Sequence, residues 1–547
     1  MNTNTNNFRI KRVTVVLAGA LAAMAVHAQT PPTDAGQTLN LLQKAPQPLP
    51  EGKELVLPAD IRAKVEQGGK TVSIKSLRFD GNEHIESSLL VLALGGEAAW
   101  AQPLDFAGLQ TLINKVTDHY RESGYPFARA FLLPGSMSDA GELNIRVVEG
   151  RYGQVVALSP DEEIAKSSTP FLSGLKTGDV VTTDALERAT LLLNDLPGYT
   201  ATPVMKPGAD IGTGDLNVVM ETDKRVQGAV GVDTYGSTYS GEFRWQGNLA
   251  INRVAVFGDE LALSAIAPIE GTWMGGFNYS MPVGAQGARM SVGTTRTGYT
   301  LDGDFVGFSG TATEKSMGVS YPLVRSRASN LSVSLSYKDK SLQDNRLGAI
   351  DQKDATTTPL VFNFDRRDGF GQGGITYGAV SFTRGNLVAA GNKTSFGRWQ
   401  TDVARLQRVS STWNLYARAV VQGARDNLDS SEGFSLGGAT GVRAYPSGEA
   451  SGDEGWLLQL EARKSLGAAE LYAFYDHGKV IVDARPELVS SPAPDQERAG
   501  AGVGIRMNEG PMKVNIALAW RTKGGLPTSE ANAGSDPRMW MSMMYSF

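Results

Sequence analysis

One arginine and one aspartate near the C-terminal end of the chain have side chains that could pair across a folded structure. Arg443 lies in a glycine-rich stretch, residues 434–448, which is typical of a loop. Asp476 lies in the segment Phe474-Tyr-Asp-His-Gly478, inside a run that alternates like a strand. A guanidinium and a carboxylate can join through two parallel hydrogen bonds, so this pair could fasten a loop to the inner wall of a barrel. The alternative is two separately solvated charges in a wet lumen.

The N-terminal residues indicate the compartment in which such elements would fold. Arg9, Lys11 and Arg12 precede an apolar segment that ends in small residues, which predicts a secretory signal peptide over residues 1–28. The apolar segment, residues 13–26, is too short to span about 30 Å of membrane as a helix. Loss of these three cations would change the formal net charge from −5 to −8. This acidic balance argues against nucleic acid as a partner.

The rest of the chain lacks both cysteine and long apolar runs. An exported protein of this size without disulfides must be held by a core or by a closed sheet. No stretch after residue 28 reaches 18 uncharged apolar residues, so no transmembrane helix is expected. A transmembrane β-barrel is compatible with this composition, because half of each strand faces a polar lumen. The alternating run at residues 539–547, which ends on Phe547, is similar to the last strand of bacterial outer-membrane barrels.

Two modules are expected ahead of the barrel. Residues 29–70 hold a short predicted helix, residues 33–44, followed by a proline-rich linker. Residues 71–150 then give the order strand, helix, helix, strand, strand. The first strand of this module is predicted from Val72 onward. Each of these elements is short, as in a small two-layer domain with helices on one face of a sheet.

The same order repeats over residues 151–225. Gly198-Tyr199 corresponds to Gly124-Tyr125 at a helix end, and in both copies an acid-Leu-Asn sequence opens the last strand. Two matches at nearly one offset indicate an internal repeat. The modules are either purely structural, or they offer an open sheet edge or a helix groove that accepts an extended peptide by strand addition.

Residues 226–547 lack helical periodicity and alternate in short runs instead. Leu331, Val333 and Leu335, for example, alternate with serines. One apolar and one polar face are what a lipid-facing wall around a wet lumen requires, whereas a soluble sandwich would carry few charges along its strands. With strands of about 10 residues, the region fits an antiparallel β-barrel of about 16 strands, and the pattern does not separate 14, 16 and 18.

The alternation also assigns the two faces of the strand around Asp476. Phe474, Asp476 and Gly478 are predicted to point into the lumen, whereas Leu471 and Tyr475 are predicted to face lipid. A lone carboxylate is tolerated in a wet lumen. A basic loop that reaches this carboxylate would make it evidence for a specific contact between the loop and the wall.

A signal, two such modules and a C-terminal barrel resemble the outer-membrane transporters of two-partner secretion. These are the haemolysin activation and secretion proteins of the ShlB/FhaC/HecB type, in one superfamily with BamA. The modules look like POTRA domains. Val442-Arg-Ala-Tyr445 is similar to the superfamily's Val-Arg-Gly-Tyr motif at a loop tip, and Phe474-Tyr-Asp-His-Gly478 fits its Phe-x-Asp-x-Gly strand motif. Asp365-Arg-Arg-Asp368 is similar to the Asp-x-Arg-Asp pattern of these barrels. The resemblance covers essentially the whole mature chain.

The resemblance implies roles for five residues. Arg443 and Tyr445 would lie at the tip of a long loop folded into the barrel. Asp476, flanked by Phe474 and Gly478, would be the partner on the inner wall. These residues form the predicted gating or loop-lock site.

Two further expectations follow from the family pattern. Ala444 stands where the pattern most often has glycine, and alanine would be strained there if the backbone needed a positive φ. The predicted helix at residues 33–44 corresponds in position to the family's N-terminal plug helix.

The implied function is an outer-membrane protein translocator of a Gram-negative bacterium, with its N-terminal domains in the periplasm. It would recognise an unfolded exoprotein through the POTRA-like domains and conduct it through the lipid-embedded barrel to the cell surface. The cargo could be an adhesin, a haemolysin or a contact-dependent toxin. The sequence has no Gly-x-x-x-x-Gly-Lys-Ser/Thr motif for ATP, so cargo binding and folding would supply the energy.

Three other functions are less consistent with the sequence. A BamA-like insertase usually carries more than two modules, and a general diffusion porin would not need them. An enzyme is suggested only by Gly433-Phe-Ser-Leu-Gly437, which matches a nucleophile elbow but lacks a following helix. No His-Glu-x-x-His motif or cluster of metal ligands is evident, so no catalytic residue, metal or cofactor is expected.

Overall fold

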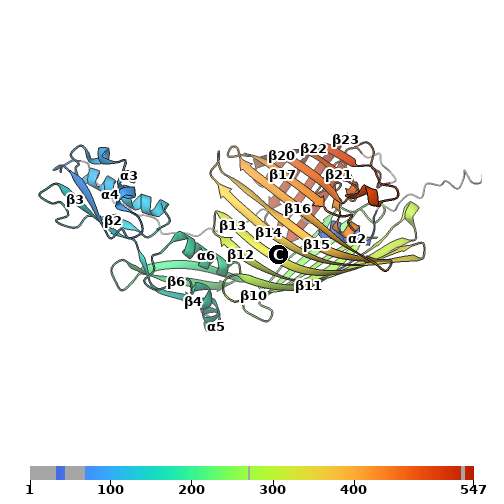
Figure 1. Ribbon diagram of the computed structural model, residues 1–547, viewed down its shortest axis with the longest axis horizontal. Helices are drawn as coiled ribbons and strands as arrows, with labels where there is room; N and C mark the ends of the chain where they lie inside the picture. The colour runs from blue at the N-terminus through green and yellow to red at the C-terminus, as the bar shows by residue number, and fades with distance from the viewer. Residues whose placement is uncertain (1–32, 44–67, 269–270, 531–535) are drawn as a thin grey trace, which may run out of the picture.

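The computed structural model describes residues 33–43, 68–268, 271–530 and 536–547. The predicted signal peptide and the proline-rich linker lie outside these residues. Figure 1 shows two small α+β modules extending from one end of a large barrel, with a short helix, α2 (Ala35–Gln43), inside the barrel. The fold class expected from the sequence is therefore confirmed.

The first module is a three-stranded sheet covered by two helices. Its elements are β1 (Ser76–Asp80), α3 (Ser87–Leu94), η1 (Glu97–Trp100), α4 (Phe106–Glu122), β2 (Arg129–Phe131) and β3 (Glu142–Val148). The strand order is β1-β3-β2, with β1 parallel to β3. The sequence predicts the first strand from Val72, but β1 begins only at Ser76, because Val72 pairs with Leu104 in an isolated bridge.

Carboxylates hold both ends of α4 in this module. Asp105 caps the start of the helix, and backbone hydrogen bonds from Gly68 and Gly108 lower the pKa of its carboxyl. Near the other end, the Tyr120 hydroxyl donates a hydrogen bond of 3.1 Å to the buried Glu149. Burial, and then the charge of Glu149, raise the pKa of Tyr120 far above its usual value. The helix is thus fixed near both ends, and its apolar face packs on the sheet.

The second module repeats this topology, as the internal repeat predicts. Its elements are β4 (Arg151–Leu158), α5 (Glu162–Ser168), η2 (Thr169–Leu172), α6 (Thr183–Asn194), β5 (Tyr199–Pro207) and β6 (Thr213–Thr222). The strand order is β4-β6-β5, again with the first strand parallel to the last. Leu193, Leu216 and Val218 lie at the centre of its core and are fully buried.

The third part is a closed antiparallel barrel of 16 strands, within the range that the sequence leaves open. The strands are β7 (Val226–Asp233), β8 (Arg244–Asn252), β9 (Glu260–Pro268), β10 (Trp273–Val283), β11 (Ala288–Thr300), β12 (Phe308–Arg325), β13 (Ser329–Arg346), β14 (Ala349–Asp368), β15 (Gly374–Ala389), β16 (Asn392–Arg408), β17 (Trp413–Ala424), β20 (Glu454–Leu466), β21 (Ala469–Ile481), β22 (Gln496–Glu509), β23 (Met512–Lys523) and β24 (Arg538–Ser546). The barrel closes between β24 and β7, where the backbone of Phe547 exchanges hydrogen bonds with Gly228.

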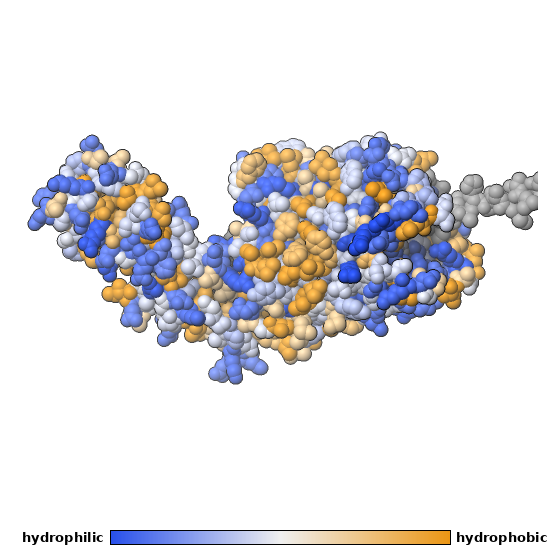
Figure 2. Space-filling view, viewed as in Figure 1, coloured by the Kyte–Doolittle hydropathy of each residue, from blue (hydrophilic) through white to orange (hydrophobic). Residues whose placement is uncertain are grey.

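Burial alternates along the barrel strands, as a wall between lipid and lumen requires. In β21, Phe474 and Asp476 are buried, whereas Leu471 and Tyr475 are exposed. Figure 2 shows apolar side chains gathered over much of the outer surface of the barrel that it displays. Within the described residues, no helix is long and apolar enough to cross a membrane.

Candidate functional site

The connection between β17 and β20, residues 425–453, folds back into the barrel and is called the inner loop here. It contains η4 (Ser430–Glu432) and a short strand pair, β18 (Phe434–Ser435) and β19 (Ser451–Gly452). Its tip is closed by a hydrogen bond of 2.6 Å from the Val442 amide to the Leu436 carbonyl. A Cβ atom on Gly441 would collide with that same carbonyl, so glycine is needed for the tight tip.

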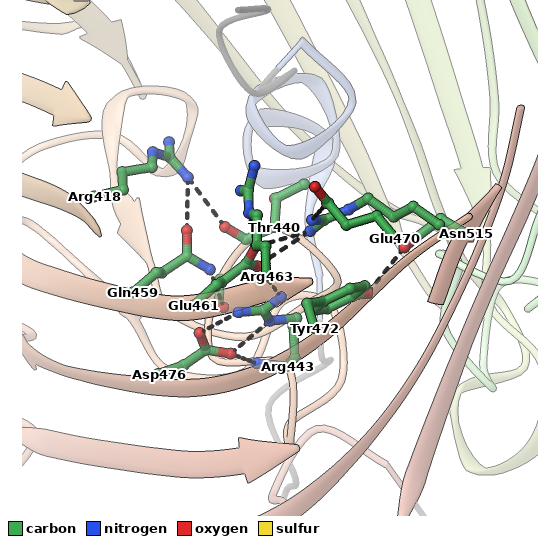
Figure 3. A network of polar contacts seen from close by, with 12 residues as sticks. Arg418, Thr440, Arg443, Gln459, Glu461, Arg463, Glu470, Tyr472, Asp476 and Asn515 are labelled. Atoms are coloured by element: carbon green, nitrogen blue, oxygen red, sulfur yellow. Dashed lines mark hydrogen bonds and ion pairs between the residues drawn. The ribbon is translucent and has the colours of Figure 1, made fainter. Parts of the chain in front are cut away.

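Arg443, at this tip, meets Asp476 on β21 (Figure 3). Its Nε and Nη2 donate to the two carboxylate oxygens of Asp476 at 2.8 and 2.7 Å, and its backbone amide donates to one of them at 3.1 Å. Its Nη1 donates to Glu461 on β20 at 2.6 Å. The guanidinium carbon lies 3.6 Å from the centre of the Phe474 ring. The two residues singled out from the sequence thus meet through the bidentate geometry that their types allow.

The charges around Arg443 balance. Glu461 also binds Arg463 at 2.8 Å and Arg506 at 3.0 Å, and Arg506 reaches Glu470 at 3.0 Å. Arg443, Glu461 and Asp476 are almost fully withdrawn from solvent, with side-chain exposures of 6%, 4% and 0%. The alternative of two separately solvated charges therefore does not describe this arrangement. Removing one partner from such a buried pair leaves an uncompensated charge, which costs about 3–5 kcal/mol.

Tyr445 and Gly478 contribute contacts of other kinds. The Tyr445 hydroxyl donates to the backbone carbonyls of Lys523 at 2.7 Å and Gly525 at 3.0 Å, which ties the tip to the end of β23. A Cβ atom on Gly478 would collide with Leu436 of the inner loop, so glycine lets the loop approach β21 closely. The five residues predicted from the sequence therefore lie at one place, where Arg443 contacts both Asp476 and Phe474.

Ala444 is not strained. It is absent from the non-glycine residues with positive φ, which are Arg253, Leu347, Ala390 and Ala450 among those described. The Ala444 side chain packs on Gly500 of β22, where a Cβ atom would collide with it. Glycine at position 500 thus provides the space that alanine at position 444 needs.

Three anchors of the inner loop were not singled out by the sequence. Glu461 faces the lumen in a strand whose residues alternate between the two faces. Its position on the lumen-facing side of that alternation could have identified it. Glu432 binds Lys340 on β13 at 2.5 Å and Arg398 on β16 at 2.7 Å. Glu449 binds Arg498 on β22 at 2.9 Å. Glu432 ends the three-residue η4 and Glu449 lies in irregular backbone, so no periodicity marks either of them as buried.

The last strand also reaches the tip. The indole Nε1 of Trp540 on β24 donates to the Arg443 carbonyl at 2.7 Å. Trp540 is buried, and its ring packs edge-on to Tyr235, which follows β7. The loop tip is therefore linked to both strands at which the barrel closes.

Helix α2 lies between the inner loop and the wall formed by β11, β12 and β13. Its first amide, on Ala35, donates to Asp344 of β13 at 2.9 Å. On the loop side, Gln37 donates to the Ser451 hydroxyl at 2.8 Å and Asn40 donates to the Gly433 carbonyl at 2.9 Å. A Cβ atom on Gly36 would collide with Ser430, so the helix lies directly on the backbone of η4.

The candidate nucleophile motif does not form an elbow. Ser435 lies in β18, paired with Ser451 of β19, and the chain continues as the loop tip without entering a helix. In the part of the chain that the structure describes, no group of three or more histidine, cysteine or acidic side chains is arranged to hold a metal ion. His84 and His477 each lie beside a glutamate, Glu149 and Glu497, at 2.6 and 2.7 Å.

A closed barrel with an inner loop ion-paired to its wall, preceded by two strand-helix-helix-strand-strand modules, is the architecture of POTRA-bearing outer-membrane barrels. The family model for the haemolysin secretion/activation proteins ShlB/FhaC/HecB matches residues 212–507, and the ShlB-type POTRA model matches residues 72–150. The first match spans more than half of the chain, and the chain belongs to this family.

Known relatives agree with this assignment. The Heme/hemopexin transporter protein HuxB of Haemophilus influenzae (strain 86-028NP) is 23% identical over 469 residues, covering 81% of this chain and 82% of the relative. The outer membrane transporter CdiB of Escherichia coli O6:K15:H31 is 24% identical over 397 residues, covering 68% of this chain and 65% of the relative.

Solved structures share the fold. CdiB from Escherichia coli superposes with a TM-score of 0.67 at 20% identity, covering 94% of this chain and 96% of that one. BamA from Haemophilus ducreyi lacking POTRA domains 1–3 gives a TM-score of 0.51 at 13% identity, covering 87% of this chain and 100% of that one.

The protein is therefore a two-partner secretion transporter of the outer membrane, with its POTRA domains in the periplasm and a secreted exoprotein as its partner. The family assignment favours this function over an insertase or a diffusion porin. Members of the family are transporters.

Proposed function

We propose that Arg443, Tyr445, Phe474, Asp476 and Gly478 form a lock that keeps the tip of the inner loop on the lumen wall while cargo crosses the barrel. The observation that carries this proposal is the buried Arg443 guanidinium, which bonds both oxygens of Asp476 and one of Glu461. A contact with this much desolvated charge holds one geometry and resists partial opening. The locked tip would keep the lumen wall rigid, so that cargo displaces other elements first.

Helix α2 is the element that cargo would displace. It lies in the lumen, and it is joined to the inner loop by neutral amide groups at Gln37 and Asn40. In this role it would act as a plug that closes the barrel at rest. Its departure would leave the lock in place and open a path along β11, β12 and β13.

The chain would divide into functional parts at the boundaries that the sequence suggests. Residues 1–28 would direct export, and residues 29–70 would carry the plug and its linker. The POTRA-like domains at residues 71–150 and 151–225 would bind the unfolded exoprotein, and the barrel at residues 226–547 would sit in outer-membrane lipid and conduct it. The cargo would be an adhesin, a haemolysin or a contact-dependent toxin, and transport would proceed without a catalytic step by this chain.

Secretion of the cognate exoprotein into the medium tests the lock. Cells would carry wild type, Arg443→Ala, Asp476→Ala, or a deletion of residues 71–225, with barrel levels in the outer membrane measured in each. We expect all three variants to lose secretion at normal barrel levels. Secretion at the wild-type rate by Arg443→Ala and Asp476→Ala would contradict the lock, and secretion by the deletion would contradict cargo recognition by the two domains.

A further inference from the structure

The segment Asp365-Arg-Arg-Asp368, which ends β14, lies far along the chain from the lock and plays no part in it. Both Asp365 carboxylate oxygens accept hydrogen bonds from the Asn330 amide group, at 3.2 and 3.0 Å. Arg367 lies beside the same carboxylate, with Nη1 at 3.3 Å. The Arg367 backbone amide donates to the Ala328 carbonyl at 2.7 Å. Asp365 and Arg367 therefore hold the turn between β12 and β13, residues 326–328.

Asn330 connects Asp365 to the residues at the start of the turn by hydrogen bonds. Its side-chain oxygen accepts from the Ser326 amide at 3.2 Å and from Nη1 of Arg325 at 2.9 Å. Because the Asn330 amide nitrogen is bound to Asp365, its oxygen is oriented toward Arg325. A carboxylate on β14 thus fixes the direction of an arginine at the end of β12.

The turn held in this way is where the second POTRA domain meets the barrel. Arg325 binds Asp195, at the end of α6, through two hydrogen bonds of 2.7 Å. Arg327 binds Glu187 of α6 with its Nε at 2.5 Å and its backbone amide at 3.1 Å. The Glu187 side chain is only 6% exposed. In Figure 1 α6 lies beside this end of the barrel.

The charges at this junction can fix the angle between the second POTRA domain and the barrel. A carboxylate at the C-terminal end of a helix is unfavourable beside the helix dipole, so Asp195 needs the cation that Arg325 supplies. Arg325 binds Asp195 through a planar fork just before the turn, and Arg327 binds Glu187 from within it, and two such contacts restrict rotation more than a single contact would. Arg188 adds a third contact by donating to the Pro322 carbonyl at 3.1 Å.

We propose that Asp365 and Asn330 are positioning residues for the POTRA–barrel junction. They hold the β12–β13 turn so that Arg325 and Arg327 face the carboxylates of α6, and this sets the angle at which the second domain presents cargo to the barrel. The proposal adds a separate task to the proposed function, because it concerns the angle between the second domain and the barrel and not the loop lock.

Asp368 provides the matched control within the same segment. Its carboxylate binds Arg405 of β16 through hydrogen bonds of 2.8 and 3.0 Å and accepts from the Phe370 amide at 3.1 Å. These partners lie on the β14–β15 turn and on β16, away from the β12–β13 turn. Replacement of Asp368 therefore removes an ion pair at the same end of the barrel without touching the junction.

A distance measured between two spin labels tests the proposal, and the absence of native cysteine makes the labelling specific. Labels would be attached to the full-length protein in lipid nanodiscs after Leu158→Cys on β4 and Val409→Cys after β16, because both side chains are exposed. Double electron–electron resonance would then be recorded for this background and for Asp365→Ala, Asn330→Ala and Asp368→Ala. Asp195→Ala, which removes the partner of Arg325 from the domain side, gives the distance distribution of a loosened junction.

We expect a single narrow distribution in the background and in Asp368→Ala, and a broadened one in Asp365→Ala and Asn330→Ala that matches Asp195→Ala. Asn330→Ala keeps the test valid if Asp365→Ala fails to reach the membrane. A narrow distribution in folded Asp365→Ala or Asn330→Ala overturns the proposal, and so does equal broadening in Asp368→Ala. The label distance needs no cargo, so this outcome is independent of whether the loop lock is required for secretion.

Discussion

The inner loop and α2 occupy the same lumen, but different forces hold them there. The inner loop is fastened by buried ion pairs to opposite parts of the wall, Arg443 to Asp476 on β21 and Glu432 to Lys340 on β13. Helix α2 is joined to that loop by hydrogen bonds from a neutral amide side chain, such as that of Asn40. An ion-paired clamp and a helix held by hydrogen bonds, some of them to carboxylates, thus lie side by side inside one barrel.

This difference suggests an order of events. A neutral hydrogen bond contributes about 0.5–1.5 kcal/mol net, because water replaces it when it breaks. Breaking a buried ion pair by losing one partner costs about 3–5 kcal/mol. Helix α2 has no charged side chain to lose from a buried pair, so we expect it to move first while the tip stays locked.

The largest expected effect comes from removing the clamp. Arg443→Ala should lower the free energy of unfolding of the barrel by about 3–5 kcal/mol, because Asp476 and Glu461 are left buried without their shared cation. Urea unfolding in lipid vesicles, followed by tryptophan fluorescence, measures this change. The double variant with Asp476→Ala should be less destabilised than the sum of the single variants.

Exposed Arg384 supplies the control for that measurement. Arg384→Ala also removes an arginine from a barrel strand, but its side chain lies at the surface. We expect a change within about 0.5 kcal/mol. If the Arg443→Ala protein is as stable as this control, the inner loop is not held more strongly than α2, and the proposed difference between them is contradicted.

A second variant separates geometry from charge at the clamp. Arg443→Lys keeps the positive charge but loses the planar fork that bonds Asp476 twice and stacks on Phe474. We expect a loss of about 1.5–3 kcal/mol in the same unfolding experiment, since hydrogen bonds to charged groups contribute about this much. Wild-type stability for the lysine variant would show that charge alone holds the tip.

The third prediction acts on the helix alone. Gly36→Val places a side chain against η4, where even a Cβ atom collides with Ser430, and overpacking of this kind costs about 1–3 kcal/mol. The variant should release α2 and raise the ion conductance of the barrel in planar bilayers, with the stability of the barrel little changed. Gly397→Val is the matched control, because a Cβ there meets nothing within 4 Å. Equal conductance in the two variants would argue against α2 as the plug.

The smallest effect is expected from a single neutral contact. Asn40→Ala removes the hydrogen bond to the Gly433 carbonyl and should weaken the seating of α2 by about 0.5–1.5 kcal/mol. Brief openings should therefore become more frequent in single-channel recordings, without the sustained conductance expected of Gly36→Val. Sustained opening in Asn40→Ala would mean that this one hydrogen bond carries most of the seating of the helix.

The fold was predictable because each part of the chain has a distinct period. Alternation in the barrel and helical spacing in the modules follow from which face each side chain presents, and both can be read from the order of residues. Two details were not predictable. The start of β1 at Ser76 depends on the pairing of Val72 with Leu104, and the strand number depends on how the sheet closes. Such contacts join residues through the folded structure and leave no local pattern.

The candidate site was predictable only in part. Arg443 and Asp476 stood out by residue type and by their resemblance to motifs, and the structure brings them together. Glu432 and Glu449 lie in the inner loop, the first at the end of η4 and the second in irregular backbone, and their partners come from distant strands. Trp540 reaches the Arg443 carbonyl from the last strand. The alternation of that strand indicates only that this side chain faces inward, not that it contacts the inner loop. Residues whose roles depend on loop path are therefore the ones that sequence patterns miss.

The central claim is that α2 leaves the lumen during secretion, and a reversible tether tests it most directly. Gln37→Cys and Ser451→Cys can be joined by a short bis-methanethiosulfonate reagent, which forms a reducible disulfide with each thiol and releases methanesulfinate, because the Gln37 amide nitrogen lies 2.8 Å from the Ser451 hydroxyl and the chain has no other cysteine. Each single cysteine variant, treated with the same reagent, is the control. We predict that the joined protein stops secreting its exoprotein and that reduction restores secretion. Secretion at the wild-type rate with the tether intact would contradict the account.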